Sequence, residues 1–169
     1  MSNIILKNII RFVLLILLQV LLFNNIHFLK FITPNIYILF ILLLPFETPK
    51  GLLLLLGFFT GLTLDIFDNT LGLHTIACTF SAFIRPWATT IISSKQDYEP
   101  GSYPGIKSLG FRWFFNYSFI VVAIHDISIF YLEIFKLTGF FETLLMAILN
   151  MIFSMIFILL IESLTEKSK

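Results

Sequence analysis

Long apolar stretches joined by short polar connections constrain this chain more than any other feature. A helix rises ~1.5 Å per residue, so crossing ~30 Å of membrane hydrocarbon takes about 20 apolar residues. Six such stretches follow one another in the 169 residues: 4–23, 33–46, 51–67, 71–92, 111–132 and 143–162. Only 12% of the residues are charged, against roughly 25% in soluble domains. The sequence therefore predicts an all-α membrane protein, a six-transmembrane-helix bundle forming one domain over residues 1–169.

The second stretch is the least regular of the six. Pro34 opens it and Pro45 follows after ten residues, and proline interrupts helical hydrogen bonding. We therefore expect this segment to be short, tilted, kinked or re-entrant, and five spans with one re-entrant segment is the alternative to six. The first stretch has no small-residue cleavage pattern after it, so we expect an uncleaved anchor.

Lysine and arginine between the spans predict the orientation, because cytoplasmic loops collect them. With six spans, nine of these residues fall on the side of the two termini and two, Lys30 and Lys136, on the other. We therefore expect both termini to be cytoplasmic. Residues 93–111, with two prolines and three glycines, are expected to form a cytoplasmic loop, which is either a plain connector or a contact site for a partner.

Composition and missing motifs exclude several classes of function. A net charge of +1 offers no basic surface for nucleic acid, and the single cysteine, Cys78, allows no intrachain disulfide or cysteine metal cluster. The sequence has no G-x-S-x-G elbow, phosphate-binding glycine loop or H-E-x-x-H pair. It also lacks the arginine ladder of voltage sensors and the repeated halves of carriers. We therefore expect no enzymatic activity, no cofactor and no resident metal.

The stretch GFFTGLTLDIFDNTLGLHT, residues 57–75, interrupts the apolar pattern. Gly57, Gly61 and Asp65 are spaced four apart, so they form one stripe on a helix. Glycines at this spacing let a second helix approach closely, and in lipid such packing drives helix association. The stripe predicts a packed face whose neighbour is either another helix of this chain or a partner protein.

Ionisable side chains lie at similar depths on two of the predicted helices. Asp65 stands ~21 Å along the third helix, counted from Gly51, and Asp126 stands ~20 Å along the fifth, next to His125. His74, which opens the fourth helix, could join them. An ionisable group in the bilayer costs ~2.5–3.5 kcal/mol or more, so it usually faces protein or water and indicates function.

Three interpretations of these four side chains stay open. They lie near the outer interface, where they are hydrated or cap helix ends. Alternatively, they are polar contacts that fix how helices pack or how a partner docks. In the third interpretation they form a metal or proton site.

Other polar residues share faces of the terminal helices. Arg11 and Gln19 lie on one face of the first, and Asn150 and Ser154 on one face of the sixth. We expect them to make packing contacts, since hydrogen bonds between membrane helices are worth about 0.6 kcal/mol on average. Arg85 is expected to extend to the cytoplasmic interface.

The stretch LGFFTGLTLDIFDNTLGLHT resembles the signature of the rod shape-determining protein MreD family. The resemblance covers residues 11–86, which include the segment AFIRP at 82–86, and the C-terminal half agrees in length, in hydropathy and in Asp126. The residues that carry it are Gln19, Pro34, Asn35, Pro45, Gly57, Phe58, Gly61, Asp65, Leu71 and Gly72.

The resemblance implies a non-enzymatic subunit of the bacterial cell-elongation machinery in the inner membrane. The implied partners are MreC, a protein with one membrane span and a periplasmic domain, the actin-like MreB filaments, the glycosyltransferase RodA and its transpeptidase. In fold, the family is similar to the six-helix substrate-binding subunits of vitamin importers.

Two functions therefore compete. In the first, the chain is a scaffold that binds partner helices, chiefly MreC, through the face of Gly57 and Gly61 and through its outer end from Asp65 to His74, with Gly72 between them. In the second, the chain is the small-molecule-binding membrane subunit of a transporter. Asp65, His74, His125 and Asp126 would then line a pocket open to the outside, as ligand sites between bundled helices do.

Overall fold

The structure is a computed structural model that describes all residues except 1, 26–32, 93–102, 135–139 and 168–169. Every secondary-structure element of the described residues is helical, so the predicted all-α class is confirmed. The elements are α1 (Ser2–Leu18), continued by the π-helical turn η1 (Gln19–Phe23), α2 (Ile38–Leu42), α3 (Lys50–Asp68), α4 (Leu73–Ile92), α5 (Ile106–Leu109), α6 (Phe111–Ile134) and α7 (Phe140–Lys167).

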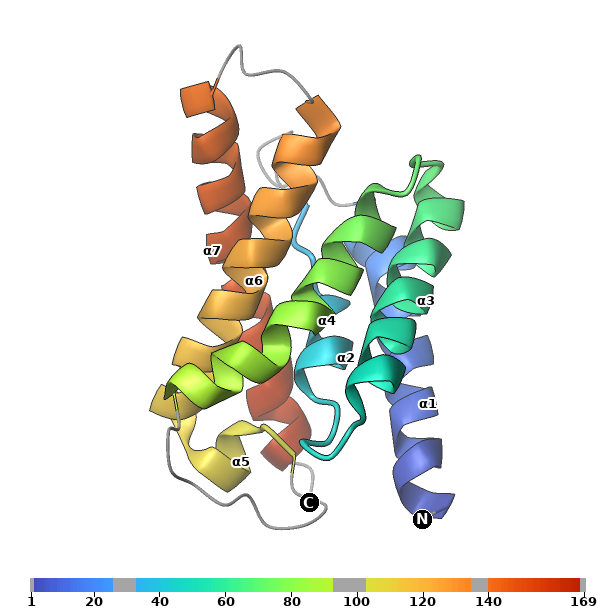
Figure 1. Cartoon of the computed structure of the whole chain (residues 1–169), viewed down its shortest axis with the longest axis vertical. Helices are drawn as coiled ribbons and strands as arrows, with labels where there is room; N and C mark the ends of the chain where they lie inside the picture. Colours follow the sequence, from blue (N-terminus) through green and yellow to red (C-terminus); the bar gives the residue numbers. More distant parts are fainter. Residues whose placement is uncertain (1, 26–32, 93–102, 135–139, 168–169) are drawn as a thin grey trace.

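The long helices run along the length of the molecule in alternating directions. Figure 1 shows α1, α3 and α6 rising from the end where the chain begins, while α4 and α7 return to it. The first turn of α1 and the last turn of α7 therefore lie at the same end of the bundle (Figure 1). Helix α4 packs against both α3 and α6, and α6 packs against α7.

Four of these helices are long and apolar enough to cross a membrane. They comprise Ile5–Phe23, Lys50–Asp68, Phe111–Leu132 and Phe141–Thr165. Helix α4 is also long, with 20 residues, but it includes His74, Arg85 and Pro86 and is less apolar.

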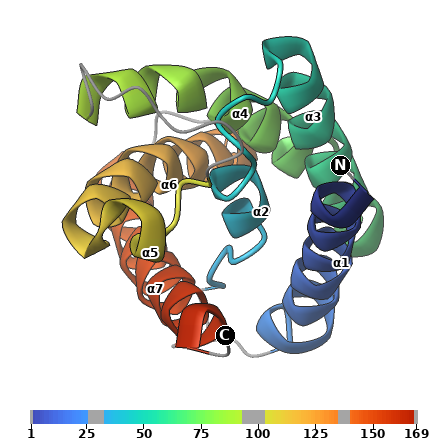
Figure 2. The ribbon, with the colours of Figure 1, turned by 90° about the horizontal axis from the view of Figure 1, so that it is seen from below.

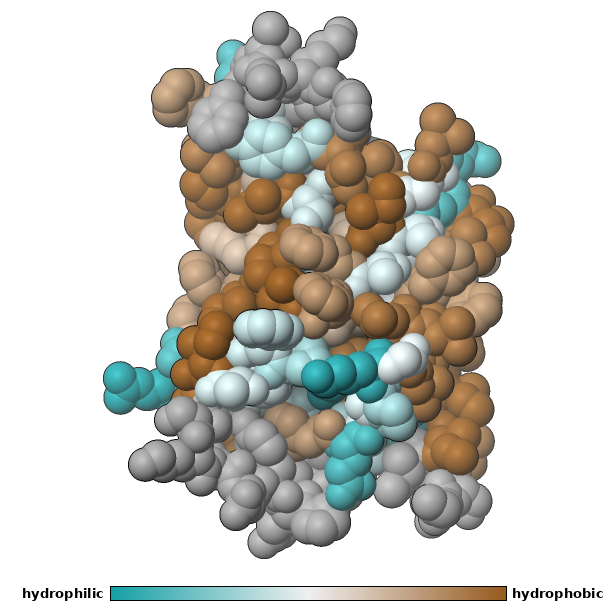
Figure 3. Space-filling view, viewed as in Figure 1, coloured by the Kyte–Doolittle hydropathy of each residue, from teal (hydrophilic) through white to brown (hydrophobic). Residues whose placement is uncertain are grey.

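The outer surface of the bundle is largely apolar. Large side chains such as Leu21, Ile66 and Ile91 are 63–71% exposed. Figure 3 shows apolar residues over most of the visible face, with the most hydrophilic ones gathered toward its lower part and at an upper corner. A surface of this kind would be unfavourable in water and fits a hydrocarbon surrounding.

The second predicted span is mostly not helical. Residues 33–44, which we call the central segment, run through the middle of the bundle, and Figure 2 shows α2 encircled by the other helices. Only Ile38–Leu42 is helical, and Ile36–Leu44 are at most 4% exposed. This agrees with the expectation of a short or kinked segment, since Pro34 and Pro45 limit the helix at either side.

The predicted cytoplasmic loop at 93–111 lies partly outside the described residues. Its last part contains α5, a short helix that contacts α6 and α7. Gly110 separates α5 from α6 at a φ of +83°, a conformation that favours glycine.

Candidate functional site

The glycine stripe of α3 is covered by α4. A Cβ atom at Gly57 would stand 2.8 Å from the Cβ of Ala82 and 2.9 Å from the carbonyl oxygen of Cys78. A Cβ atom at Gly61 would collide with the backbone of His74 and Thr75. The glycines therefore let two helices of the same chain pack backbone to backbone. Of the two neighbours that the stripe left open, the structure has the one within the same chain, α4, and this face is therefore not free to bind a partner protein.

Asp65 continues the stripe and caps α4 from the neighbouring helix. Its two carboxylate oxygens accept hydrogen bonds from the backbone N–H groups of His74 at 3.0 Å and Thr75 at 2.9 Å. The hydroxyls of Thr70 and Thr75 donate to the same carboxylate, each at 2.5 Å. A helix start leaves such N–H groups unpaired, and a nearby carboxylate also interacts favourably with the helix dipole.

Gly72 explains why the cap comes from α3. It directly precedes α4 and has a φ of +88°, so it has no side chain that could cap the helix and a backbone that a larger residue would strain. Asp65 supplies the missing acceptor across the turn. The turn and the glycine stripe thus form one unit, the α3–α4 hairpin.

Tyr37 connects the two predicted histidines. Its hydroxyl lies 2.8 Å from Nδ1 of His74 and 3.0 Å from Nε2 of His125. Nδ1 of His125 lies 2.9 Å from the carboxylate of Asp126, and at the other end Nε2 of His74 lies 3.5 Å from Asp68. These five side chains form one continuous chain of titratable groups, which we call the His–Tyr–His relay.

The hydrogen bonds of the relay can be arranged in two ways. The Tyr37 hydroxyl has one hydrogen, so it donates to one histidine and accepts from the other. If it donates to His125, the contact between His74 and Asp68 needs an added proton; if it donates to His74, the pair of His125 and Asp126 needs it. The two arrangements contain the same number of protons, so the geometry allows a proton to move between the ends.

Asp126 is buried and held from three directions. It is 0% exposed, and besides His125 it accepts hydrogen bonds from the side-chain amides of Asn35 at 2.9 Å and Asn150 at 3.2 Å. Several donors of this kind are what a buried carboxylate requires. Asp126 thus joins α6 to α7 and to the central segment.

The start of the central segment has backbone N–H groups that no helix satisfies. Polar side chains of the terminal helices accept their hydrogen bonds. The N–H of Ile36 donates to Gln19 at 2.9 Å, and those of Asn35 and Thr33 donate to Ser154 at 2.9 Å and Asn150 at 3.1 Å. Irregular backbone at membrane depth is tolerated only where protein groups pair it in this way.

At the end of the central segment, backbone carbonyl groups accept hydrogen bonds from long side chains of other helices. Arg11 donates to Leu43 at 2.9 Å and Arg85 donates to Leu44. The Tyr117 hydroxyl donates to Leu42 at 3.0 Å and accepts from Arg85 at 2.8 Å. Arg85 is 3% exposed, so the expectation that it extends to the interface is wrong.

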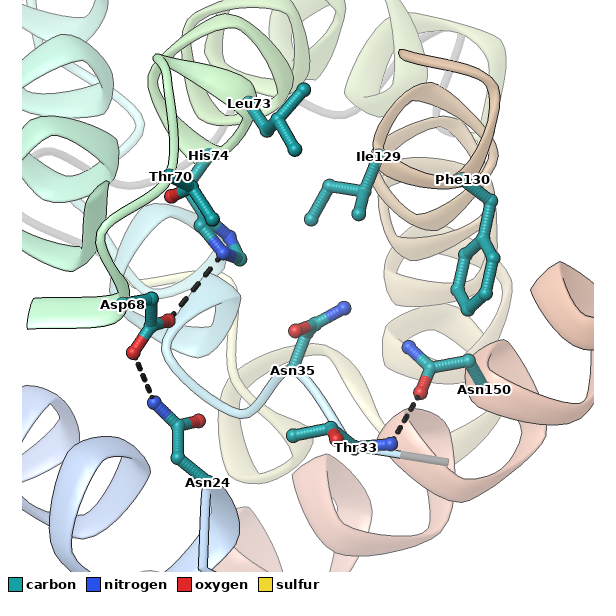
Figure 4. Close-up of a pocket in the computed structure, with 10 residues that line it drawn as sticks. All are labelled: Asn24, Thr33, Asn35, Asp68, Thr70, Leu73, His74, Ile129, Phe130 and Asn150. Carbon is teal, nitrogen blue, oxygen red and sulfur yellow. Dashed lines mark hydrogen bonds and ion pairs between the residues drawn. The ribbon is translucent and has the colours of Figure 1, made fainter. Parts of the chain in front are cut away.

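A cavity of about 380 Å³ opens beside the relay. Its lining combines polar side chains with an apolar wall, as Figure 4 shows: Asn24, Thr33, Asn35, Asp68, Thr70, Leu73, His74, Ile129, Phe130 and Asn150. Of the eight predicted site residues, only His74 lines this cavity. Gln19 and Asp126 support its walls through Asn24 and through Asn35 and Asn150.

Sequence reasoning missed Tyr37, Asn24 and Asn35 as site residues. Tyr37 gave one signal, because it is the only hydroxyl in the apolar run from Ile36 to Leu44 and a buried Tyr hydroxyl usually finds a partner. Among the described residues no three His, Cys, Asp or Glu side chains gather closely enough to hold a metal ion.

Comparison with known proteins finds no matching family model, no matching curated protein and no matching solved structure. The resemblance to the MreD family is therefore still a prediction from the sequence.

Proposed function

We propose that the chain is a non-enzymatic scaffold subunit of the bacterial cell-elongation machinery, in the cytoplasmic membrane. The supporting observation is that the residues behind the resemblance act as one unit. Gly57 and Gly61 allow α3 and α4 to pack closely, Asp65 caps α4, and Gly72 forms the turn between them. Residues that are recognisable as a pattern in the sequence thus have connected roles in one hairpin.

We also propose six membrane crossings with both termini cytoplasmic. Helix α4 and the central segment would be the two crossings beyond the four strongly apolar helices. Two observations support this topology: α1 begins and α7 ends at the same end of the bundle (Figure 1), and with six spans the sequence assigns nine of its eleven Lys and Arg residues to the side of the two termini.

The proposed docking surface for MreC is a groove between α1 and α3, since α4 covers the glycine face. The groove has a volume of about 700 Å³. Ile9 and Leu52, one on each wall, are 54% and 46% exposed. In lipid, helices associate by van der Waals packing of ridges into grooves, and an apolar groove of this kind suits the single membrane span of MreC. The main wall residues are Ile5, Ile9, Phe12, Leu52, Leu56 and Phe59.

Filling the groove tests this surface. We expect Ile9→Trp and Leu52→Trp to reduce co-purification of MreC while the protein still inserts into the membrane. Leu160→Trp is the matched control, because Leu160 is 51% exposed on α7 and lies outside the groove. Recovery of MreC that is equal for all three variants would exclude the groove.

The scaffold role itself has a separate test. Depleting the protein from its host should abolish rod shape, and the purified complex should contain MreC and, through it, MreB, RodA and the transpeptidase. Normal rods after depletion would contradict the proposal.

The polar cavity favours a second candidate function, the small-molecule-binding membrane subunit of a transporter. Three asparagines, an aspartate and a histidine line it, and ligand sites of bundles are built from such converging groups. The co-purifying partner distinguishes the candidates, since a scaffold would bring cell-wall synthases and a transporter subunit would bring an ATPase.

A further inference from the structure

We propose that the cavity between the α3–α4 turn, α6, α7 and the central segment binds a small organic molecule that has a cationic amine and several hydroxyl groups. The inference deepens the second candidate function, because it names the class of molecule that the same cavity would bind, and a scaffold could also have such a site.

The size and shape of the cavity suit a small molecule. Its volume of about 380 Å³ lies within the ~300–1,000 Å³ typical of ligand sites. Figure 4 shows an apolar wall of Leu73, Ile129 and Phe130 facing a polar wall that includes Asp68 and Asn35. A ligand with a carbon skeleton and polar substituents on one side would match both walls.

The charge of the lining selects against anions. Among the ten lining residues that the structure describes, one is acidic and none is Lys or Arg. A carboxylate has about four acceptor positions, and Asp68 uses one oxygen for Asn24 at 2.5 Å and the other for His74 at 3.5 Å. Its side chain is 23% exposed, so it can accept further hydrogen bonds from an ammonium group, and charge-assisted bonds of this kind are the stronger ones.

The asparagines are fixed in place before any ligand arrives. Asn150 accepts from the backbone of Thr33 and donates to Asp126, and Asn35 donates to the same carboxylate. Asn35 lies on the polar side of the cavity in Figure 4, and the carbonyl oxygen of its side chain can accept a hydrogen bond from a hydroxyl group. Side chains that other contacts already hold lose little conformational entropy when a ligand binds, and this favours ligand binding in the cavity.

Three related polyols test the proposal on the full-length protein in lipid nanodiscs. D-glucamine is cationic, D-sorbitol is neutral and D-gluconate is anionic, while the three have similar size and hydroxyl content. Saturation-transfer NMR with titration should give saturable binding of glucamine that is about tenfold tighter than that of sorbitol, and no binding of gluconate.

Two variants and a control locate the binding. Asp68→Asn should reduce glucamine affinity about tenfold, to that of sorbitol. Ile129→Trp should fill the cavity and abolish binding of both compounds. Glu47→Gln, which changes a carboxylate in the apolar groove, should leave binding unchanged.

The proposal is overturned if none of the three compounds binds saturably, if gluconate binds as well as glucamine, or if both cavity variants bind like the wild type. These outcomes do not bear on the scaffold, because co-purification of MreC is measured separately.

Discussion

The close packing of α3 against α4 predicts a graded response to adding one methyl group along the glycine stripe. At Gly61 the added Cβ would stand 2.5 Å from the carbonyl carbon of His74. Ordinary contact begins at ~3.5 Å, so the two helices would have to part by about 1 Å. Overpacking of this kind costs about 1–3 kcal/mol.

The same displacement would also break the cap of α4. Asp65 is one turn beyond Gly61, and its oxygens lie 3.0 and 2.9 Å from the backbone nitrogens of His74 and Thr75. Parting by about 1 Å would take both beyond hydrogen-bond range, and a lost cap costs about 0.5–2 kcal/mol. We therefore expect Gly61→Ala to lower the free energy of unfolding by about 1.5–5 kcal/mol.

Two further substitutions complete the series. Gly57→Ala meets Ala82 at 2.8 Å and Cys78 at 2.9 Å but lies farther from the cap, so we expect a loss of about 1–3 kcal/mol. Gly51→Ala is the control, because no heavy atom lies within 4 Å of its added Cβ; the higher helix propensity of Ala should raise stability by up to about 1 kcal/mol. Unfolding of the full-length variants in mixed micelles measures all three. A Gly61→Ala variant as stable as Gly51→Ala would refute the reasoning.

Three other predictions concern polar groups. Asp65→Ala should lower the free energy of unfolding by about 0.5–2 kcal/mol through loss of the α4 cap. Asp65→Asn should lower it by less, because the amide oxygen can still accept a hydrogen bond from the start of α4. Arg85→Leu removes the donor of two buried hydrogen bonds, one to the carbonyl of Leu44 and one to the hydroxyl of Tyr117, and should cost about 1–3 kcal/mol for each, whereas a stability equal to that of the wild type would show that the arginine is dispensable there. Tyr37→Phe removes the hydroxyl that contacts both rings, so ¹⁵N NMR should show changed chemical shifts for Nδ1 of His74 and Nε2 of His125, and shifts equal to those of the wild type would contradict the contact.

Much of the fold follows from patterns that lie within single segments of the sequence. The apolar stretches predicted the long helices, because the length and hydropathy of a helix depend on adjacent residues alone. The spacing of Gly57, Gly61 and Asp65 likewise predicted one packed stripe. The neighbour of that stripe was left open, since a spacing on one helix contains no information about which second helix fills the space.

The central segment is stabilised by contacts between residues distant in sequence, which local patterns do not predict. Pro34 and Pro45 indicated an interrupted span, but its backbone is stable there only because side chains such as Gln19 and Arg85, distant in sequence, pair its free N–H and carbonyl groups. Arg85 was expected at the interface because an isolated arginine in a helix tends to extend toward water. The carbonyl of Leu44, to which it donates, comes within reach of Arg85 only once the bundle has formed.

The sequence predicted some members of the His–Tyr–His relay but not the residue that joins them. His125 and Asp126 adjoin in the sequence, and His74 was added to the same group because it opens the fourth predicted helix. Tyr37 joins them from a segment whose path through the bundle could not be read from its own residues. Asp65 matched the depth of Asp126, yet its carboxylate caps α4 and takes no part in the relay.

Site-specific photo-crosslinking in growing cells tests the proposed scaffold function most directly. A photoreactive amino acid at position 9, in the groove between α1 and α3, should crosslink to MreC, and the same amino acid at position 160 on α7 should not. Loss of the position 9 crosslink in the Leu52→Trp background would place MreC in the groove. Absence of any MreC crosslink from position 9, or equal crosslinking from both positions, would contradict the proposal.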